Sequence, residues 1–483
     1  MTAPGEATSG EATPGEATPG EAAPTDRPAG PRRPTRLAPV ALTLGFLDEA
    51  SVRLRAEAGG EPDWLLADRL AAQALVDALP IESNQLYTPY VDLRAARLDD
   101  VVPHALVASG PVAGAPGATG DDMAGLIELR EDGVEVLWLS EPARRAGVTL
   151  ATFGELLRSD PDRLRRHLDG GGQVAADDKL AQATRAHWNQ GVLLDVPAGA
   201  RLERPVVIRW AAGAPGRALL GRTVIALGED AEASVVEEIV PSFVLPAGAG
   251  QALYAATTEV RLERNASLAL ASVQELGLNT VAFQHRDAVI GHRASLRWAL
   301  AQLGGPLVRS RVDNRLVGDG STVEQVEIVF GAGTQLFDLT SYTRHIGRDT
   351  TGNLLSKGVL LDGSRSFMKG LITIERTAIG TDSFLGEYGM NLSKEARSVA
   401  IPSLEFDQPD CRRAAHSSSV GPIDEGQIFY LESRGIPRDE ARKFIVLGYV
   451  EPVVARVPLV EEQDRLRELL DAKWTASARP AAA

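Results

Sequence analysis

The sequence predicts a mainly β protein, with a right-handed parallel β-helix core flanked by helical regions at its N-terminal and C-terminal ends. Helical patterns are scarce in residues 188–406, where short Val, Ile, Leu and Thr runs alternate with small turns. A turn followed by small residues and a new strand recurs near Ala231, Ala266, Ala294 and Ser321, at offsets of 35, 28 and 27 residues. These offsets are too irregular for a strict short-repeat solenoid but suit stacked coils. A β-sandwich is the alternative.

The N-terminal part of the chain changes character twice. Residues 1–36 repeat the unit GEATPG and then turn to Pro and Arg, with almost no large apolar side chains to offset the entropy of ordering, so we expect an acidic disordered tail. Residues 37–180 form a mixed, mainly helical region. Within it GEPDWLLADRLAAQALVDALP carries one apolar face at helical spacing and stops at Pro80, and residues 110–120 suit a linker.

The β-helix is expected over residues 181–421, a C-terminal helical domain over 422–475 and a disordered tail over 476–483. Asp424, with Gln427 three residues later, resembles a capping box. Gly435 suits the end of that helix and Pro437 the first turn of another, which is expected to run up to Pro452.

Composition excludes several classes of protein. The chain has 483 residues, 44% of them hydrophobic, and a net charge of −15, which argues against nucleic acid as a partner. Its single cysteine, Cys411, excludes an internal disulfide and a self-contained four-thiolate cluster or zinc site. The start lacks an apolar signal segment, and the apolar run at residues 37–47 is too short to span a bilayer, so a cytoplasmic protein without membrane contact is expected.

The usual local signatures of catalysis are missing. The sequence has no G-x-x-x-x-G-K-[ST], G-x-S-x-G, H-E-x-x-H or C-x-x-C motif. We therefore expect a non-catalytic protein that works with partners.

One segment gathers residues that could carry chemistry. The run PDCRRAAHSSSVGPIDEGQIFYLESRGIP brings Cys411 and His416 together where the β region gives way to helices. Imidazole and thiolate are both good ligands for iron. In the alternative reading, which residue chemistry alone favours, Cys411 is a small apolar side chain and His416 a hydrogen-bonded turn residue.

The run HSSSVGPIDEGQIFYLESRGIPRDEARKFIVLGYVEPVVARVPL resembles the C-terminal signature shared by the SufB and SufD proteins of iron-sulfur cluster assembly. In that family a histidine-led segment precedes Q-[IL]-F-Y-L and an S-R-G-[IL]-P helix junction. Upstream, NQGVLLDVPAGARLERPVVIRW, SKGVLLDGSRSFMKGLITIERTAIGTDS and NLSKEARSVAIPSLEF resemble the family's β-helix in the same order. The likeness extends to EPDWLLADRL and NQLYTPYVDL, so it covers most of the chain beyond the tail.

Within this family the sequence is more similar to the SufD branch. SufB subunits carry a cysteine in the β-helix before the final coil and a glutamate directly after the histidine, whereas this chain has Tyr388 near the first place and Ser417 at the second. His416 falls on the histidine of the SufD segment C-S-H-G-A-T-V-G, and is a candidate iron ligand. Cys411 lies five residues before His416 instead of two, which on strand alternation puts the two on opposite faces, so Cys411 is a weaker candidate.

The resemblance also implies partners and cargo. It implies pairing with SufB through the β-helices and docking of the SufC ATPase on the C-terminal helices, for which the candidates are Tyr430, Arg434, Gly435, Arg438 and Glu440. Simple packing of these helices against the β-helix is the alternative. The implied cargo is a transient iron-sulfur cluster or iron at the SufB interface. Flavin binding is compatible with the family but has no motif here, and self-pairing as a homodimer is a further alternative.

Two other functions stay open on the sequence. One is a SufB-like scaffold that accepts sulfur on Cys411. The other is an unrelated β-helix enzyme acting on carbohydrate, which would need a cluster of acidic and basic groups along one face. His285, His292 and His345 are expected to be hydrogen-bonded structure and not ligands.

Overall fold

The computed structural model describes residues 42–81, 93–105, 122–169, 172–243, 245 and 248–477. The chain divides into two units, Met1–Pro39 and Val40–Ala483, and every described residue belongs to the second. The tail predicted at 1–36, the linker predicted at 110–120 and residues 478–483 of the tail predicted at 476–483 lie outside the described residues. Residues 476 and 477 belong to the last helix, so the predicted start of that tail was two residues too early.

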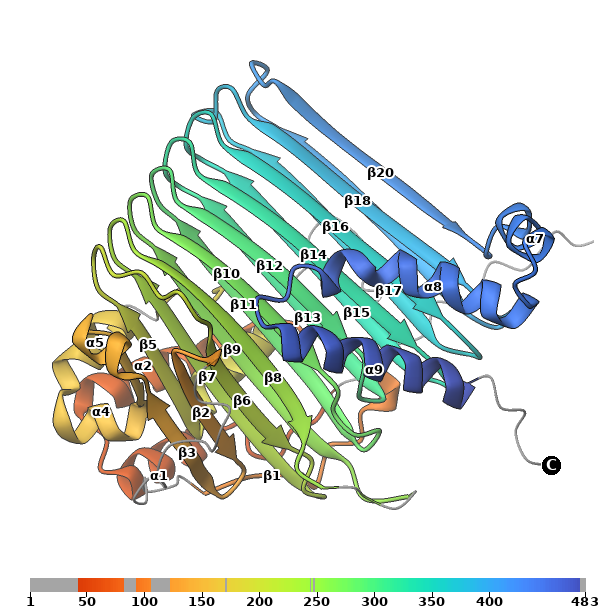
Figure 1. The fold of residues 1–483 in the computed structure, drawn as a ribbon. Coiled ribbons are helices and arrows are strands. Elements are labelled where there is room, and N and C mark those ends of the chain that lie inside the picture. Colours follow the sequence, from red (N-terminus) through yellow and green to blue (C-terminus); the bar gives the residue numbers. More distant parts are fainter. Residues whose placement is uncertain are drawn as a thin grey trace, which may run out of the picture. The chain divides into compact units, whose positions relative to one another are not determined.

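Residues 190–421 form a parallel β-helix of two long sheets, in which successive strands alternate between one sheet and the other (Figure 1). We call these the odd sheet and the even sheet, after their strand numbers. The odd sheet contains β5 (Gln190–Val196), β7 (Arg217–Leu227), β9 (Ala252–Leu262), β11 (Thr280–Ile290), β13 (Leu307–Leu316), β15 (Leu336–His345), β17 (Arg365–Ile374) and β19 (Arg397–Phe406). The even sheet contains β6 (Val206–Ala212), β8 (Glu232–Pro241), β10 (Ser267–Gln274), β12 (Ser295–Gln302), β14 (Thr322–Gly331), β16 (Thr351–Leu360), β18 (Asp382–Asn391) and β20 (Arg413–Gly421).

The recurring turns of the sequence coincide with the coils of this β-helix. Glu232, Ser267, Ser295 and Thr322 form one row of directly paired residues across four parallel strands. Each of them follows one of the four turn residues that recur in the sequence. The predicted parallel β-helix is therefore confirmed, and the parallel register excludes the β-sandwich.

One corner of the β-helix explains why the coils can stack despite their unequal lengths. Each of six coils places a residue with φ between +53° and +76° at this corner, a conformation that Gly, Asn and Asp adopt at low cost. These residues are Asp230, Asn265, Arg293, Gly320, Asp349 and Gly380. Their N–H groups donate to carbonyls of the next coil, from Asp230 to Arg264 at 2.9 Å through to Gly380 to Asp410 at 2.8 Å. The hydrogen-bond ladder thus continues through the corner, and the length differences are absorbed elsewhere.

The N-terminal region adds short helices and strands to the first coils. It comprises α1 (Glu49–Gly59), α2 (Asp63–Ala78), the 3-10 turn Leu93–Ala95, β1 (Val102–Pro103), β2 (Gly125–Arg130), β3 (Gly133–Leu139), α3 (Glu141–Arg145), β4 (Thr149–Thr152), α4 (Phe153–Ser159), α5 (Pro161–Leu168) and α6 (Lys179–His187). β2 extends the even sheet in parallel, but β3 pairs with β2, and β4 with β5, in antiparallel fashion. At this end, both sheets therefore finish on a short reversed strand.

Three helices follow the β-helix: α7 (Glu425–Ser433), α8 (Arg438–Val454) and α9 (Val460–Ser477). Asp424 caps α7 by accepting from the N–H of Gly426 at 2.8 Å, and Gly435, with φ of +87°, lies beyond its end. Pro437 is the residue before α8 and not in its first turn, and α8 continues past Pro452 to Val454, two residues beyond the predicted end. The described helices include none long and apolar enough to cross a membrane.

Helices α8 and α9 lie across the outer face of the even sheet (Figure 1). Their buried apolar side chains form one cluster with outward-facing apolar side chains of the sheet. The helix side chains include Val446, Val450, Val453, Leu466 and Leu470, and those of the sheet include Ala271, Ala299, Ile328 and Phe330. The C-terminal helices are thereby joined to the β-helix by a shared core.

Candidate functional site

The last coil of the β-helix is its open end. β20 pairs only with β18, and β19 only with β17, among the described strands. The side chains of residues 416–420 on β20 are exposed, and so is Phe406 at the end of β19. In Figure 1, β20 forms the rim of the even sheet, beyond β18. This coil therefore offers free backbone groups and exposed side chains together.

His416 lies in the middle of this edge. It is exposed, and its direct neighbour across the strand pair is the buried Leu385 of β18. Two residues earlier, Ala414 packs against an apolar cluster between the sheets that includes Leu385. Because side chains alternate along a strand, His416 and Ala414 share one face, and this is the face that continues the interior of the β-helix.

Cys411 is placed differently from the expectation. The expectation assumed one extended strand through both residues, but β20 begins at Arg413, so strand alternation does not set the direction of the thiol. Cys411 is half-buried and packs on the same apolar cluster as Ala414. The argument from strand alternation therefore does not apply to this pair of residues.

A row of residues, all polar except Leu300, runs through the interior and ends at this edge. Each member is directly paired with the next across the even sheet. The row consists of Glu237, Ser272, Leu300, Glu327, Ser356, Glu387 and Ser418. Burial raises the pKa of Glu327 and Glu387, that of Glu387 to about 8. The Glu387 carboxyl group is therefore held in the neutral form at neutral pH.

Glu387 is the functional candidate that sequence reasoning missed. It is 1% exposed, and its Oε2 has no hydrogen-bond partner among the described residues. Its Oε1 reaches across to the odd sheet, where a Cβ on Gly370 would come within 2.8 Å of it. The signal in the sequence is a glutamate within GEYG, on a strand whose alternation turns it inward beside glycines that leave it room.

Tyr388 faces the other way, toward α8. Lys357, its direct neighbour on β16, donates to the carbonyl of Tyr449 in α8 at 2.9 Å, and its Nζ lies 4.4 Å from the centre of the Tyr449 ring. Burial, with the nearby Tyr388, raises the pKa of Tyr449. The residue near the SufB cysteine position is thus part of the contact between the even sheet and α8.

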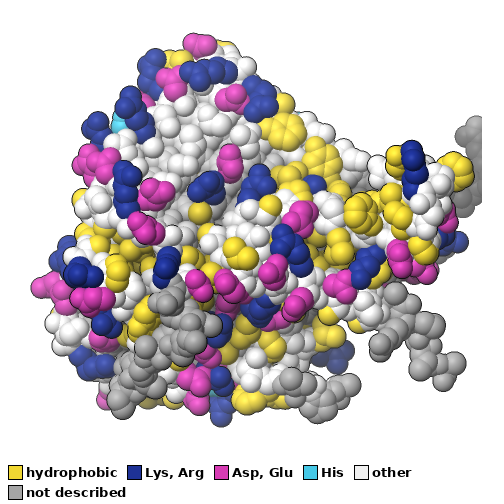
Figure 2. All heavy atoms as spheres, in the orientation of Figure 1, with side chains coloured by type: hydrophobic (Ala, Val, Ile, Leu, Met, Phe, Trp, Pro, Cys, Tyr) yellow, Lys and Arg dark blue, Asp and Glu magenta, His cyan; other side chains and the backbone are white. Residues whose placement is uncertain are grey.

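The C-terminal helices carry an exposed apolar surface. Phe429, Tyr430 and Phe444 are 72%, 57% and 69% exposed. Tyr430 and Phe444 line a groove between α7 and α8, together with Leu431 and Ile445. Figure 2 shows hydrophobic side chains gathered over α7 and the adjacent end of α8. Exposed large apolar side chains at this density are typical of protein interfaces.

The five residues predicted to dock the ATPase are all exposed and lie at the junction of α7 and α8. The Arg434 guanidinium lies 5.3 Å from the centre of the Tyr430 ring. Arg438 pairs with Glu425 at 2.5 Å and with Glu432 at 3.4 Å, so it ties the start of α8 to α7. Glu440 is exposed, and Gly435 provides the left-handed turn between the helices.

His345 and His285 are engaged in structure. His345 is buried between Thr350 and Ser383, at 2.8 and 3.0 Å, and burial lowers its pKa to about 4. His285 bonds Asp313 at 2.8 Å and lies near Asp287, a grouping that could hold a metal ion. Two arginines already occupy these carboxylates, Arg311 on Asp313 at 2.7 Å and Arg315 on Asp287. We therefore interpret this grouping as an ion-pair network.

The fold and its open edge define a class of protein: a parallel β-helix that presents an edge strand and an apolar helical surface to partners. Residues 210–449 match the family model described as SUF system FeS cluster assembly, SufBD core domain. The chain belongs to the SufBD family of iron-sulfur cluster assembly proteins.

Three relatives show how far the similarity extends. The iron-sulfur cluster assembly protein SufD of Bacillus subtilis (strain 168) is 25% identical over 446 residues, which cover 89% of this chain and all of the relative. A SufBD family protein of Staphylococcus epidermidis (strain ATCC 12228) is 25% identical over 83% of this chain and 87% of its own length. One of Staphylococcus haemolyticus is 24% identical over 86% and 90%.

Proposed function

We propose that this chain is a SufD-type scaffold subunit, which pairs with a SufB subunit through the open end of its β-helix and docks a SufC ATPase on its C-terminal helices. Its role is non-catalytic, in the cytoplasm, and its cargo is a nascent iron-sulfur cluster or iron held where the two scaffolds meet. The observation that carries this proposal is the exposed His416 on a last strand whose outer edge has no partner among the described strands.

The open edge supports pairing of two scaffolds. A strand with unpaired N–H and C=O groups is a template for another strand. β20 has no proline, so every residue can donate, whereas Pro402 interrupts the donors of β19. We therefore expect the even sheet to be the one that continues into the partner.

The ligand count supports a shared site. Iron in a cluster needs about four ligands, and this edge offers one imidazole, one thiol and the hydroxyl of Ser418 nearby. One chain alone is therefore insufficient. A partner that brings further ligands to the same edge would complete the coordination, with His416 as the contribution of this subunit.

The apolar groove between α7 and α8 supports docking of a protein partner. Phe429, Tyr430 and Phe444 would lose most of their exposed surface in such a contact. Docking here would also reach the even sheet, because α8 is joined to it through Lys357 and the shared core. Movement of the docked ATPase would then act on the strands next to β20.

The SufD assignment within the family is supported by two positions. Ser417 follows His416 where SufB has a glutamate, and Tyr388 faces α8. The alternative of a SufB-like sulfur acceptor would require Cys411 to accept sulfur, and its packing against an apolar cluster limits access to the thiol.

The test is co-purification of the tagged chain with SufB and SufC from the same cell, followed by anaerobic reconstitution and measurement of cluster absorbance. We expect a three-protein complex, and we expect His416→Ala to leave the complex intact but lower the cluster yield severalfold. His292→Ala is the matched control, because His292 is a half-buried turn residue away from β20.

Failure of the complex to form would end the SufD proposal. An intact complex with equal cluster yield from His416→Ala and His292→Ala would remove His416 from the site. Cys411→Ser separates the alternative function, since a persulfide that forms on the wild type and disappears with this variant would favour a sulfur acceptor. A stable homodimer that persists in the presence of SufB would favour self-pairing.

A further inference from the structure

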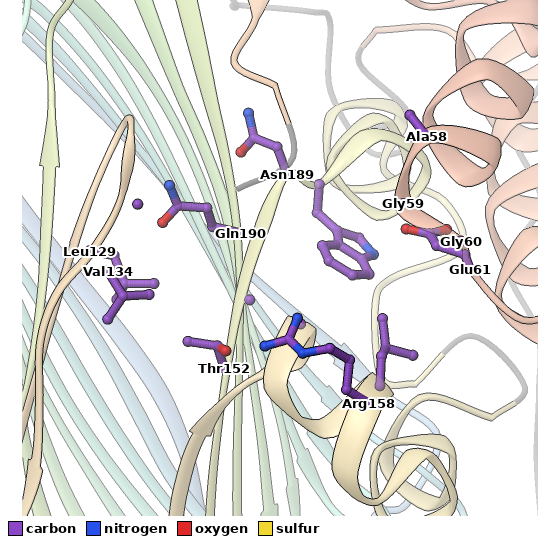
Figure 3. Close-up of a pocket in the computed structure, with 15 residues that line it drawn as sticks. Ala58, Gly59, Gly60, Glu61, Leu129, Val134, Thr152, Arg158, Asn189 and Gln190 are labelled. Atoms are coloured by element: carbon purple, nitrogen blue, oxygen red, sulfur yellow. The ribbon is translucent and has the colours of Figure 1, made fainter. Parts of the chain in front are cut away.

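The N-terminal half of α9 lies over the even sheet (Figure 1), where the outer face of the sheet carries a row of charged residues. Glu128 on β2, Arg209 on β6 and Glu238 on β8 are direct neighbours in this row. Side chains alternate along a strand, so Glu128 faces outward while the next residue, Leu129, faces the other way and lines a cavity near the first coil (Figure 3). Glu462 of α9 is 3% exposed and meets the row at Glu238.

Two carboxyl groups come together at this contact. The carboxyl of Glu462 is hydrogen-bonded to the carboxyl of Glu238, which is also 3% exposed. A carboxylate only accepts hydrogen bonds, so a bond between two carboxyl groups requires a proton on one of them. Like charges at this distance in a buried place also disfavour ionisation of both groups. The geometry therefore indicates a pair that holds one proton between its two members.

On the sheet side of the contact, positive charge comes from arginines that also serve other carboxylates. Arg209 donates to Glu238 and also to Glu128, the latter at 3.0 Å. Arg130 lies farther out, since its side chain is 46% exposed, and it pairs with Glu128 at 3.3 Å. The charge that the sheet offers to Glu238 is therefore divided between two carboxylates.

The arginine on the helix side is divided in the same way. Arg465 donates to both oxygens of Glu462, at 3.0 and 3.2 Å, and it also pairs with Glu275, which follows β10. Apart from the exposed Arg130, four carboxyl groups of this contact thus share two arginines: Glu128, Glu238, Glu275 and Glu462 share Arg209 and Arg465. A proton on the carboxyl pair brings these charges closer to balance.

The electrostatics of Glu462 agree with this geometry. Burial and the facing carboxyl of Glu238 raise the pKa of Glu462 to about 8, although the nearby Arg209 opposes the rise. A raised pKa means that the contribution of this group to stability is fully present below pH 4.5 and is lost as the pH rises through about 8. The contact of α9 with the sheet should therefore weaken in alkaline solution.

We propose that Glu462 and Glu238 share one proton, and that this proton holds the N-terminal half of α9 on the even sheet. When the proton leaves, two carboxylates repel each other across the contact and α9 loosens. The effect extends to α8, because Arg467 of α9 pairs with Glu451 of α8 at 2.8 Å. This pH-sensitive contact is independent of the proposed scaffold function, because none of its residues belongs to β20 or lines the groove between α7 and α8.

Hydrogen exchange of the full chain from pH 6 to pH 9, in chelator-treated buffer, tests the proposal. The readout is the ratio of the protection factors of residues 460–467 in the wild type to those in Glu462→Gln, whose amide needs no proton. We expect this ratio to fall about tenfold per pH unit up to pH 8 and then to level off, because opening of the wild-type contact releases one proton. Burial lowers the pKa of Lys473, farther along α9, to about 7, but this lysine is present in both proteins and cancels from the ratio.

Glu461→Gln is the matched control, because Glu461 is the neighbour of Glu462 on α9 but is exposed, and its ratio to the wild type should not change with pH. Glu238→Gln removes the other half of the pair and should abolish the same pH dependence. Infrared spectroscopy at pH 7 detects the proton directly: Glu462→Gln should lower the absorbance of protonated carboxyl groups, and Glu461→Gln should not. A ratio for Glu462→Gln that is constant from pH 6 to pH 8, an equal pH dependence for Glu461→Gln, or unchanged infrared absorbance in Glu462→Gln would each overturn the proposal.

Discussion

The two outer faces of the β-helix are covered in different ways. The odd sheet is covered by the N-terminal region through an apolar cluster and also through buried charges. One of these is Asp178 at the start of α6, which accepts from Arg309 at 2.7 Å and from Arg311 at 3.3 Å. The even sheet is covered by α8 and α9 through apolar side chains such as Val453 and Leu470. A buried ion pair costs much when one partner is lost, whereas an apolar contact loses free energy in proportion to the volume removed. The odd-sheet face should therefore be the less tolerant of substitution.

The largest effect is expected for Asp178→Ala. Burial favours a raised pKa for this carboxyl, but Arg309 and Arg311 outweigh burial and hold its pKa well below its usual value. Removing it leaves two buried guanidiniums without this carboxylate and uncaps α6, so we expect a loss of about 3–5 kcal/mol in the free energy of unfolding, measured in urea. Asp177→Ala is the control, because that side chain is 59% exposed and its pair with Arg311 should be worth under about 1 kcal/mol. Similar losses for the two variants would contradict the comparison.

Leu470→Ala tests the apolar cover. Leu470 is 1% exposed on α9, and its truncation should cost about 2–4 kcal/mol through lost burial and a cavity. Because the contact joins one helix to a sheet, we expect the loss to appear as faster hydrogen exchange in α9, with α2 unchanged. The exposed Glu468→Ala should leave exchange as in the wild type. An equal increase of hydrogen exchange in α2 would mean that the N-terminal and C-terminal helices unfold as one unit.

Glu387→Gln tests the interior of the β-helix, which neither the N-terminal helices nor α8 and α9 reach. The pKa of Glu387 is raised from 4.5 to about 8 by burial, so its contribution to stability is fully present below pH 4.5 and is lost as the pH rises through about 8. The isosteric amide has no such dependence. We expect the variant to be more stable than the wild type above pH 8, by on the order of 3 kcal/mol at most, and to have a flatter stability profile in thermal unfolding. Parallel profiles from pH 5 to 9 would show that Glu387 ionises without penalty.

The smallest effects are expected where the C-terminal helices are least covered. Gly435 has φ of +87°, so Gly435→Ala should cost about 1 kcal/mol through backbone strain. Gly448 lies within α8, and a Cβ there would meet no atom within 4 Å, so Gly448→Ala should gain up to about 1 kcal/mol. In chemical denaturation we expect Gly435→Ala to lower the free energy of unfolding and Gly448→Ala to raise it. A loss from both would indicate that α8 bends at Gly448 in solution.

The sequence predicted the β-helix well because its signals are local. Turn residues such as Asn265 and Gly320 mark each corner, and the strands between them are apolar and β-branched. The antiparallel strands β3 and β4 were not predicted, because short strands at a sheet end depend on the sheet that they join. The helices that cover the two sheets were predicted in part. The apolar face of α2 is visible in the sequence, but the ion pairs that join the N-terminal region to the odd sheet, such as that of Asp178 with Arg309, connect residues more than a hundred positions apart.

At the candidate site, too, contacts between residues distant in the sequence could not be predicted. His416 was found through a contiguous motif, and its exposed place on an edge strand agrees with a ligand role that awaits its test. Strand alternation could not be applied to Cys411, because the start of β20 at Arg413 could not be read from the sequence alone. Glu387 was missed because its burial results from Gly370 on another strand, a relation that only the coil register reveals.

The antiparallel strands at the first coil also limit how many copies can join end to end. A stack of parallel coils with two open ends could grow into a fibre, since each end would accept the next chain. Here β3 and β4 present reversed strands at one end, and only the other end keeps the parallel coil direction. The parallel direction of the coils can therefore be continued by another chain at one end only.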